Sequence, residues 1–285
     1  MSRWSAIRSS PSGSDSVRFP DDLLLNYMSN APLALAFERY LECRILGQVP
    51  FRRPVLDLGC GDGLFAHLLF GEPIDTGIDP NPRELERARR RGSYLELIEG
   101  VGSAVPKPSG AYQTIFSNSV LEHIPVLAPV FREVHRLLVP GGRLYLTVPT
   151  PLFEQFTVLN SLLTGIRFER LAARYRQFCS RVLWRQEHYH TREEWQSIAE
   201  SHGFLPIDAV TYDPKSICLL NDVLYPLAGL SLLSRRVFDR WVLWPRLRRI
   251  TMRPLRRIVE GFLERGLRAD RGGLVFLALE KDASR

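Results

Sequence analysis

The sequence predicts an α/β fold built on a parallel sheet, and three observations lead to this prediction. A short apolar run at 54–58 has the length and flanking residues of a buried strand, and a glycine-rich turn follows it directly. Segments typical of strands and helices then alternate along the chain as far as residue 149. A Pro-Gly-Gly reversal at 140–142 separates an amphipathic helix from the strand expected at 143–148.

The glycine turn is the first candidate ligand site. Asp57 precedes glycines at alternate positions, Gly59, Gly61 and Gly63, and a helix is expected at 64–70. A strand, a glycine turn and a helix N-terminus together present backbone N–H groups to a ligand. The spacing differs from the dinucleotide fingerprint, whose third glycine would come one position later. The Asp57 carboxylate would also repel a pyrophosphate, so the turn favours a neutral or cationic ligand.

The second strand, expected at 74–79, ends in a carboxylate. Asp79 lies twenty residues after Gly59. At this place a βαβ unit holds both ribose hydroxyls of a nucleoside, because two adjacent O–H donors match two carboxylate oxygens. The following Pro80-Asn81-Pro82 ends the strand and begins a basic helix at 83–91. The alternative is that Asp79 only caps this helix.

Four motifs in order resemble those of class I S-adenosylmethionine-dependent methyltransferases of the type 11 kind. They are the glycine turn, Asp79, the run Ser-Asn-Ser-Val-Leu-Glu-His-Ile at 117–124 after a strand at 112–116, and the Pro-Gly-Gly reversal. The resemblance covers around half of the chain. It implies a three-layer α/β/α, Rossmann-like fold with a seven-stranded sheet, an antiparallel last strand and helical insertions. It also implies S-adenosyl-L-methionine as the cofactor.

The same resemblance implies which residues bind the cofactor. Many relatives have an acid near Val101 that accepts from the adenine amino group, so adenine is expected here to meet apolar and backbone groups. Arg39 or Tyr27, on or before a helix expected at 30–47, could meet the methionine carboxylate or line the cap over the cofactor. The alternative is that this helix only packs on the sheet edge, with Arg39 in solvent. The expected binding residues are Asp57, Gly59, Cys60, Gly61, Gly63, Asp79, Pro80, Val101, Gly102, Asn118 and Ser119.

Catalysis by such an enzyme needs little from the side chains, because the methyl group leaves an already activated sulfonium and positioning supplies much of the rate. A hydroxyl acceptor would still need a base. His190 and His188 are the candidates for a base or a substrate contact, because they lie just before the helix expected at 191–203, and relatives often place the residue before this helix over the substrate. His123 is a weaker candidate. No metal site is predicted, because the His188 and His190 rings would point to opposite faces of a strand and no third ligand is in view.

Two helical insertions, 150–190 and 213–266, depart from the common core. The second contains an apolar stretch at 217–233, which polar residues and a proline interrupt and which is shorter than a membrane span. The net charge of the chain is +7, and nine arginines lie between Arg235 and Arg257. Arginine and tryptophan beside an apolar stretch suit an anionic membrane surface. A lid over an apolar substrate and a plain packing subdomain are the alternatives.

The expected organisation is a flexible tail at 1–22, a core at 23–212 that carries the first insertion, the second insertion at 213–266, and the last strand and tail at 267–285. Four scattered cysteines indicate neither a zinc cluster nor a disulfide framework and fit a reducing cytoplasm. We therefore expect a cytoplasmic protein, peripheral on the inner face of the membrane, that methylates a small-molecule or lipid-linked acceptor. The sequence indicates no oligomeric state.

Two other functions stay open at this point. RNA methylation would use the same arginines as a phosphate-binding face, but no RNA-binding module is recognisable and nucleic acid is not the favoured partner. A non-catalytic protein that binds the cofactor is the other, with Val101 and Gln113 as departures from the family's usual residues.

Overall fold

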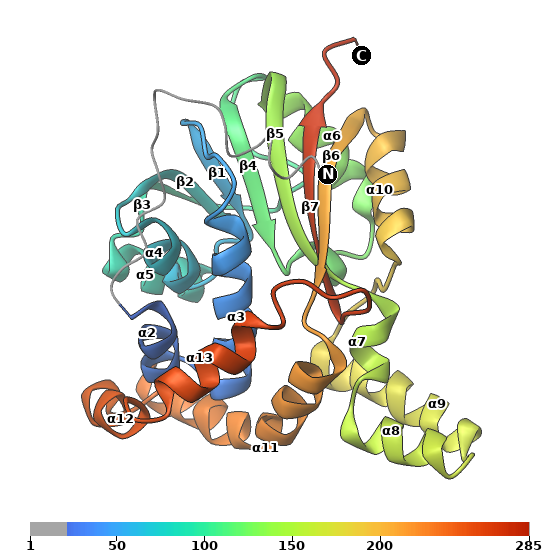
Figure 1. Ribbon diagram of the computed structural model, residues 1–285. Coiled ribbons are helices and arrows are strands. Elements are labelled where there is room, and N and C mark those ends of the chain that lie inside the picture. The colour runs from blue at the N-terminus through green and yellow to red at the C-terminus, as the bar shows by residue number, and fades with distance from the viewer. Residues whose placement is uncertain (1–21, 285) are drawn as a thin grey trace.

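A computed structural model describes residues 22–284, and its centre is a seven-stranded sheet (Figure 1). The strand order is β3-β2-β1-β4-β5-β7-β6, and β7 runs antiparallel to both of its neighbours. Both features confirm the predicted fold class. The strands are β1 (Val55–Leu58), β2 (Ile74–Asp79), β3 (Tyr94–Glu99), β4 (Tyr112–Asn118), β5 (Leu138–Pro149), β6 (Phe204–Tyr212) and β7 (Leu274–Lys281).

Helices cover both faces of the sheet, each over its own apolar core. One core joins the sheet to α2 (Leu23–Asn30), α3 (Leu33–Leu46), α4 (Leu64–Phe70) and α5 (Pro82–Arg91). The other joins it to the short helix η1 (Leu121–His123), α6 (Leu127–Leu137) and α10 (Arg192–Ser201), and Trp195 is its largest fully buried side chain. The inner strands β1, β4, β5 and β7 are mostly buried on both faces, which explains their largely apolar sequences, whereas the edge strands β3 and β6 are partly exposed.

The remaining helices gather at the end of the molecule where the parallel strands terminate (Figure 1). From the first insertion come α7 (Pro151–Gln155), α8 (Val158–Gly165), α9 (Glu169–Phe178) and the π-helical segment η2 (Cys179–Trp184). From the second come α11 (Lys215–Phe238), α12 (Pro245–Met252) and α13 (Arg256–Glu264). In α/β sheets ligands bind at this end, next to the point where the strand order reverses, which here lies between β1 and β4.

Three expectations need correction. The apolar stretch in the second insertion is one continuous helix of 24 residues that contains Pro226, and not a shorter, interrupted segment. The Pro-Gly-Gly reversal lies inside β5, next to an irregularity in its pairing with β4. The helix α2 was not predicted, because the first helix was expected to begin only at residue 30, where α2 ends. The expected tail lies outside the described residues, apart from residue 22.

By length and composition α11 is able to cross a membrane, with a mean hydropathy of 1.5 and 17% of the apolar window buried. In the fold it packs on α3 and α8, so composition alone does not define its role.

Candidate functional site

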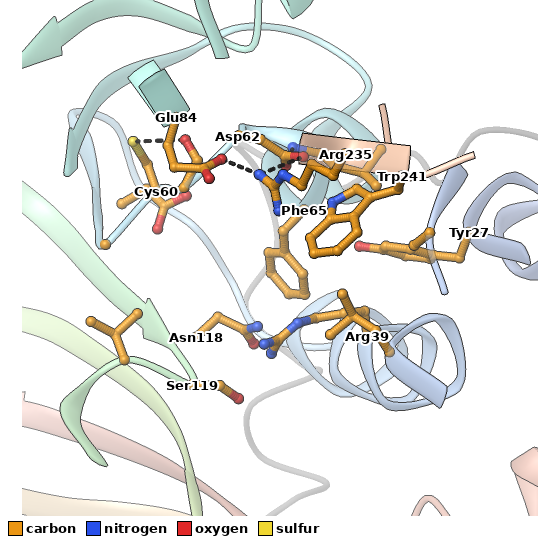
Figure 2. Close-up of a pocket in the computed structure, with 17 residues that line it drawn as sticks. Tyr27, Arg39, Cys60, Asp62, Phe65, Glu84, Asn118, Ser119, Arg235 and Trp241 are labelled. Carbon is orange, nitrogen blue, oxygen red and sulfur yellow. Dashed lines mark hydrogen bonds and ion pairs between the residues drawn. The ribbon is translucent and has the colours of Figure 1, made fainter. Parts of the chain in front are cut away.

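A cleft opens beside the glycine turn, at the carboxyl ends of β1 and β4 (Figure 2). The turn is held by two hydrogen bonds, from the Gly59 and Cys60 amides to the carbonyl of Ile78. Gly59 has a φ of +86°, and a Cβ atom there would lie 2.5 Å from Cγ2 of Val120. This position therefore requires glycine for its backbone angle and for the close approach of the segment after β4.

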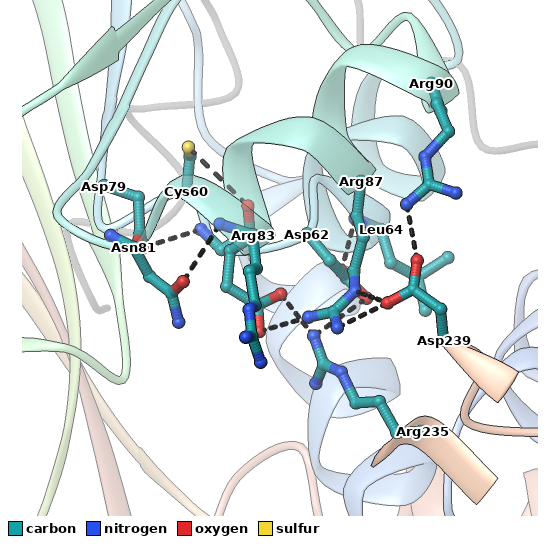
Figure 3. Close-up of polar contacts among 12 residues, drawn as sticks. Cys60, Asp62, Leu64, Asp79, Asn81, Arg83, Arg87, Arg90, Arg235 and Asp239 are labelled. Atoms are coloured by element: carbon teal, nitrogen blue, oxygen red, sulfur yellow. Dashed lines mark hydrogen bonds and ion pairs between the residues drawn. The ribbon is translucent and has the colours of Figure 1, made fainter. Parts of the chain in front are cut away.

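Asp79 braces the turn from the end of β2. Its carboxylate accepts hydrogen bonds from the Gly61 amide at 3.0 Å and from the Asn81 amide at 2.8 Å (Figure 3). Asn81, and not Asp79, caps α5, through a bond from the Arg83 amide. The two amides fix the orientation of the carboxylate at the edge of the cleft, so Asp79 is positioned before any ligand arrives.

A buried carboxylate that the sequence analysis missed connects α3 to the end of β4. Glu42 is fully buried and accepts hydrogen bonds from Arg39 at 2.6 Å, Asn118 at 2.8 Å and Ser119 at 2.9 Å. Arg39, Asn118 and Ser119 all line the cleft, and Figure 2 shows Arg39 next to Asn118. A signal was present in the sequence, because Glu42 lies between the apolar residues Leu41 and Cys43 and one turn after Glu38 on the same helix.

Asp57 lines the cleft from within the sheet. Its carboxyl is buried and accepts a hydrogen bond from the Tyr94 hydroxyl at 2.7 Å. Burial raises the pKa of Asp57 to about 7, against the lowering effect of the Tyr94 bond. The nearby Asp79 carboxylate also raises this pKa, and a cationic ligand would relieve the repulsion between the two acids.

The second insertion closes one side of the cleft. A lid was one of the three roles expected for it, beside a membrane-binding element and a packing subdomain. Arg235, near the end of α11, bonds to Glu84 on α5 and lies 3.7 Å from Asp62 in the glycine turn. Its guanidinium lies 3.9 Å from the ring centre of Trp241, and both residues line the cleft. Asp239, between them, forms ion pairs with two arginines of α5 (Figure 3). These contacts join residues about 150 positions apart, so no local pattern reveals them.

The structure brings most of the expected cofactor residues to one place. Asp57, Gly59, Cys60, Gly61, Asn118 and Ser119 line the cleft. Gly63 ends the turn at the start of α4, and Asp79 contacts the turn by accepting the hydrogen bond of the Gly61 amide. Val101, which is about half exposed, and Gly102 lie on the loop after β3 and do not belong to this lining, and neither does Pro80. Their part in binding adenine or ribose stays a prediction.

The three candidate bases lie outside the lining of this cleft. His188 contacts the Ile124 carbonyl through Nε2 at 3.0 Å, and His123 contacts the Arg185 carbonyl through Nδ1 at 3.0 Å. The His190 ring packs edge-on against Trp195, and burial lowers the pKa of His190. The rings of His188 and His190 stack with centroids 5.5 Å apart. They do not point to opposite faces, because this segment is not a strand.

Glu122, in η1 after β4, is a further buried acid. Its Oε2 atom has no hydrogen-bond partner within residues 22–284. Burial raises the pKa of Glu122 to about 8, so at neutral pH the carboxyl holds its proton. Within the same residues, no three His, Cys, Asp or Glu side chains are grouped so as to hold a metal ion.

Comparison with known proteins finds a family that matches about a third of the chain. Residues 56–146 match the family described as "Methyltransferase domain". A trans-aconitate 2-methyltransferase from Methylobacterium nodulans is 37% identical over 117 residues, 39% of this chain and 44% of that protein. A ubiquinone biosynthesis O-methyltransferase from Xanthomonas oryzae is 32% identical over 100 residues, 33% of this chain and 41% of that protein. This chain therefore spans less than half the length of these curated relatives.

A solved structure extends the similarity to the whole fold. A SAM-dependent methyltransferase from Thermotoga maritima superposes with a TM-score of 0.57 at 15% identity. The superposition covers 88% of this chain and 92% of that chain. At this level of identity the similarity concerns the fold alone.

Proposed function

We propose that this chain is a class I S-adenosylmethionine-dependent methyltransferase, which binds S-adenosylmethionine in the cleft described above and transfers the methyl group to a small-molecule or lipid-linked acceptor. The observation that carries the proposal is the hydrogen bond by which Asp79, at the end of β2, holds the glycine turn at the end of β1. The family match supports the cofactor, and the names of the two curated relatives support a small acceptor.

The residues of the cleft fit this cofactor by charge and shape. Asp57 brings a buried carboxyl whose ionisation a sulfonium or an ammonium group would favour. Asp62 and Glu84 also line the cleft, where they pair with Arg235. Arg39 offers a guanidinium to the methionine carboxylate. Asp79, already oriented by two backbone amides, offers its oxygens to the ribose hydroxyls.

In the proposed mechanism the bound cofactor supplies a methyl group on an activated sulfonium. The protein's task is then to hold cofactor and acceptor in line and to exclude water. Asn118 and Ser119, fixed by Glu42, form one wall of the cleft, and Trp241 with Arg235 forms the opposing cover. For a hydroxyl acceptor, His190, His188 and the weaker His123 remain the proposed bases or substrate contacts.

We further propose that the enzyme is cytoplasmic and works as a peripheral protein on the inner face of the membrane. The arginine-rich second insertion supports this location through the attraction of its charge to anionic lipid. RNA methylation is the second candidate function, and the same arginines favour it. It predicts co-purification with nucleic acid and a steep loss of binding as salt is raised.

Calorimetry with S-adenosylhomocysteine tests the cofactor site. We expect binding to the wild type and its loss in Gly61→Arg and in Asp79→Ala. An absence of binding to the wild type, or unchanged binding in both variants, would reject the enzyme assignment. Incubation with labelled cofactor, beside a membrane-lipid extract and a soluble metabolite pool, then shows which fraction takes the methyl group.

A further inference from the structure

The helix α11 presents apolar residues outward as well as toward the core. Five of them recur every three or four positions and are 55–71% exposed, which places them in one row along the helix. Ile217, Leu220 and Leu224 pack on the core, so the exposed row is additional to the apolar side that anchors the helix. A surface helix of a water-soluble protein usually keeps its outward side polar. We call this row the apolar stripe: Val223, Leu227, Leu230, Leu233 and Val237.

The apolar surface continues onto α12. Trp244, Leu247 and Ile250 are 57–70% exposed, and a groove lined by Leu230, Trp244 and Leu247 joins α12 to the stripe. Figure 1 shows α8, α11 and α12 side by side along one end of the molecule. An exposed apolar surface of this extent marks a binding surface rather than ordinary scatter.

Unpaired positive charge accompanies the apolar residues. Five exposed arginines on and after α11 have no acidic partner within residues 22–284: Arg236, Arg240, Arg246, Arg253 and Arg257. The acids of this region are already occupied, since Asp222 accepts from the Val158 amide and Asp239 pairs with Arg87 and Arg90. Arg240 and Arg246 line one groove together with Trp244 and Leu247, so the surface there is both apolar and cationic, which is the combination that binds an anionic bilayer.

Other occupants fit these observations less well. A second copy of the chain would bring arginines against arginines across a two-fold interface. Nucleic acid would pair with the arginines but would leave the aliphatic stripe in water. A transmembrane orientation conflicts with the packing of α11 on α3 and with the contact of Arg235 on Glu84, which tie both parts of the helix to the α/β domain.

We propose that the apolar stripe, Trp244, Leu247, Ile250 and the five unpaired arginines form a membrane-binding face on which α11 lies in the plane of an anionic bilayer. The choice of partner rests on the proposed function, because the bilayer would supply a lipid-linked acceptor. Trp241 lines both the groove between α11 and α12 and the cofactor cleft. An acceptor with its tail in that groove would therefore reach the cleft without leaving the membrane surface.

Flotation of the full chain with phosphatidylcholine vesicles, with and without phosphatidylglycerol, tests this proposal. We expect binding to the anionic vesicles, at least tenfold weaker in Leu230→Gln/Leu233→Gln and in Arg236→Gln/Arg240→Gln/Arg253→Gln. Leu95→Gln, at a 70% exposed position on β3, and Arg192→Gln on α10 are the matched controls and should bind as the wild type does.

The absence of wild-type binding to anionic vesicles would overturn the proposal, and so would equal losses in the stripe variant and the Leu95→Gln control. A dimer in sedimentation analysis that Leu230→Gln/Leu233→Gln dissociates would assign the face to a second copy instead. Calorimetry with S-adenosylhomocysteine without vesicles separates the two proposals. A protein that binds the nucleoside but not vesicles rejects only the membrane face, and the reverse result rejects only the cofactor site.

Discussion

At the scale of single residues, the cleft depends on atoms that touch across the chain. Gly59 leaves room for Val120, and the buried Glu42 holds Arg39, Asn118 and Ser119. The glycine was predictable, because a strand followed by alternate glycines is a local pattern. The contact with Val120 was not, since it joins two loops 61 positions apart.

Gly59→Ala should disrupt the turn, because the new Cβ atom would overlap Val120. The alanine would also have to adopt the left-handed backbone conformation of Gly59. We expect a loss of about 2–4 kcal/mol in the free energy of unfolding and at least tenfold weaker binding of S-adenosylhomocysteine. Denaturant titration and calorimetry measure the two effects. Gly165→Ala is the control, because a Cβ there meets nothing within 4 Å. Equal stability in both variants would contradict the close approach at Gly59.

Glu42→Gln keeps the shape of the side chain but removes the charge that Arg39 faces. We expect a loss of about 2–4 kcal/mol in unfolding free energy, because a mostly buried guanidinium loses its main partner. Binding of S-adenosylhomocysteine should weaken at least tenfold as Asn118 and Ser119 lose their anchor. Glu193→Gln, at an exposed position on α10, should change neither quantity. Normal affinity in Glu42→Gln would show that Glu42 is structural only.

The buried Glu122 makes stability depend on pH. Its folded-state pKa is raised by burial from an ordinary value of 4.5 to about 8, so the folded state holds a proton that the unfolded state releases. The stabilisation is fully present below pH 4.5 and is lost as pH rises toward 8, at up to ~1.4 kcal/mol per pH unit.

Urea unfolding of the wild type and of Glu122→Gln between pH 5 and pH 8 measures this contribution. We expect the decline of stability with pH to be shallower in the variant. The dependence of stability on pH that remains in the variant reports other buried acids. Among them are Asp57 and Asp213, whose pKa values burial raises to about 7. Parallel profiles for the two proteins would mean that Glu122 is already ionised in the folded state.

At the scale of elements, local signals located the strands well. The expected limits of 74–79 agree with β2, where glycine and proline bound the run, and the strands expected at 112–116 and 143–148 lie within β4 and β5. The helix α11 was harder to predict. Asn221, Asp222 and Pro226 are poor helix residues, but packing on α3 and α8 maintains the helix through them. Tertiary contacts decided that element, and these were not visible in the sequence.

The end of α11 also covers the cofactor cleft, which leads to a prediction for this element. Trp241→Ala removes the ring beneath Arg235 and should open that side of the cleft. We expect S-adenosylhomocysteine to dissociate about tenfold faster, with a smaller change in its association rate. Trp244→Ala is the matched control, since this tryptophan is 69% exposed and lies outside the cleft lining. Stopped-flow fluorescence gives both rates, and equal rates for the two variants would remove the covering role.

At the scale of the whole molecule, the cleft and the proposed membrane-binding face lie at the same end. The cleft forms at the carboxyl ends of β1 and β4, and the insertions extend that end into a helical layer (Figure 1). Within residues 22–284, neither insertion reaches the far end, where the turns that begin the parallel strands lie. The arginines and exposed apolar side chains of the second insertion thus lie around the opening of the site. Composition alone predicted only the excess of arginine in one segment.

This arrangement predicts a specific pattern of hydrogen exchange on anionic vesicles. Amides of α11 and α12 should exchange more slowly on phosphatidylglycerol-containing vesicles, because the bilayer covers them, whereas β1 to β7 should be unchanged. High salt should reverse the protection in part, since the Debye length shrinks from about 10 Å at 0.1 M to 3 Å at 1 M and the arginine contribution falls with it. The apolar contribution of the stripe would persist. Protection spread evenly over the sheet would instead indicate general stabilisation, and protection at the loops that begin the strands would place the bilayer on the opposite end, away from the cleft.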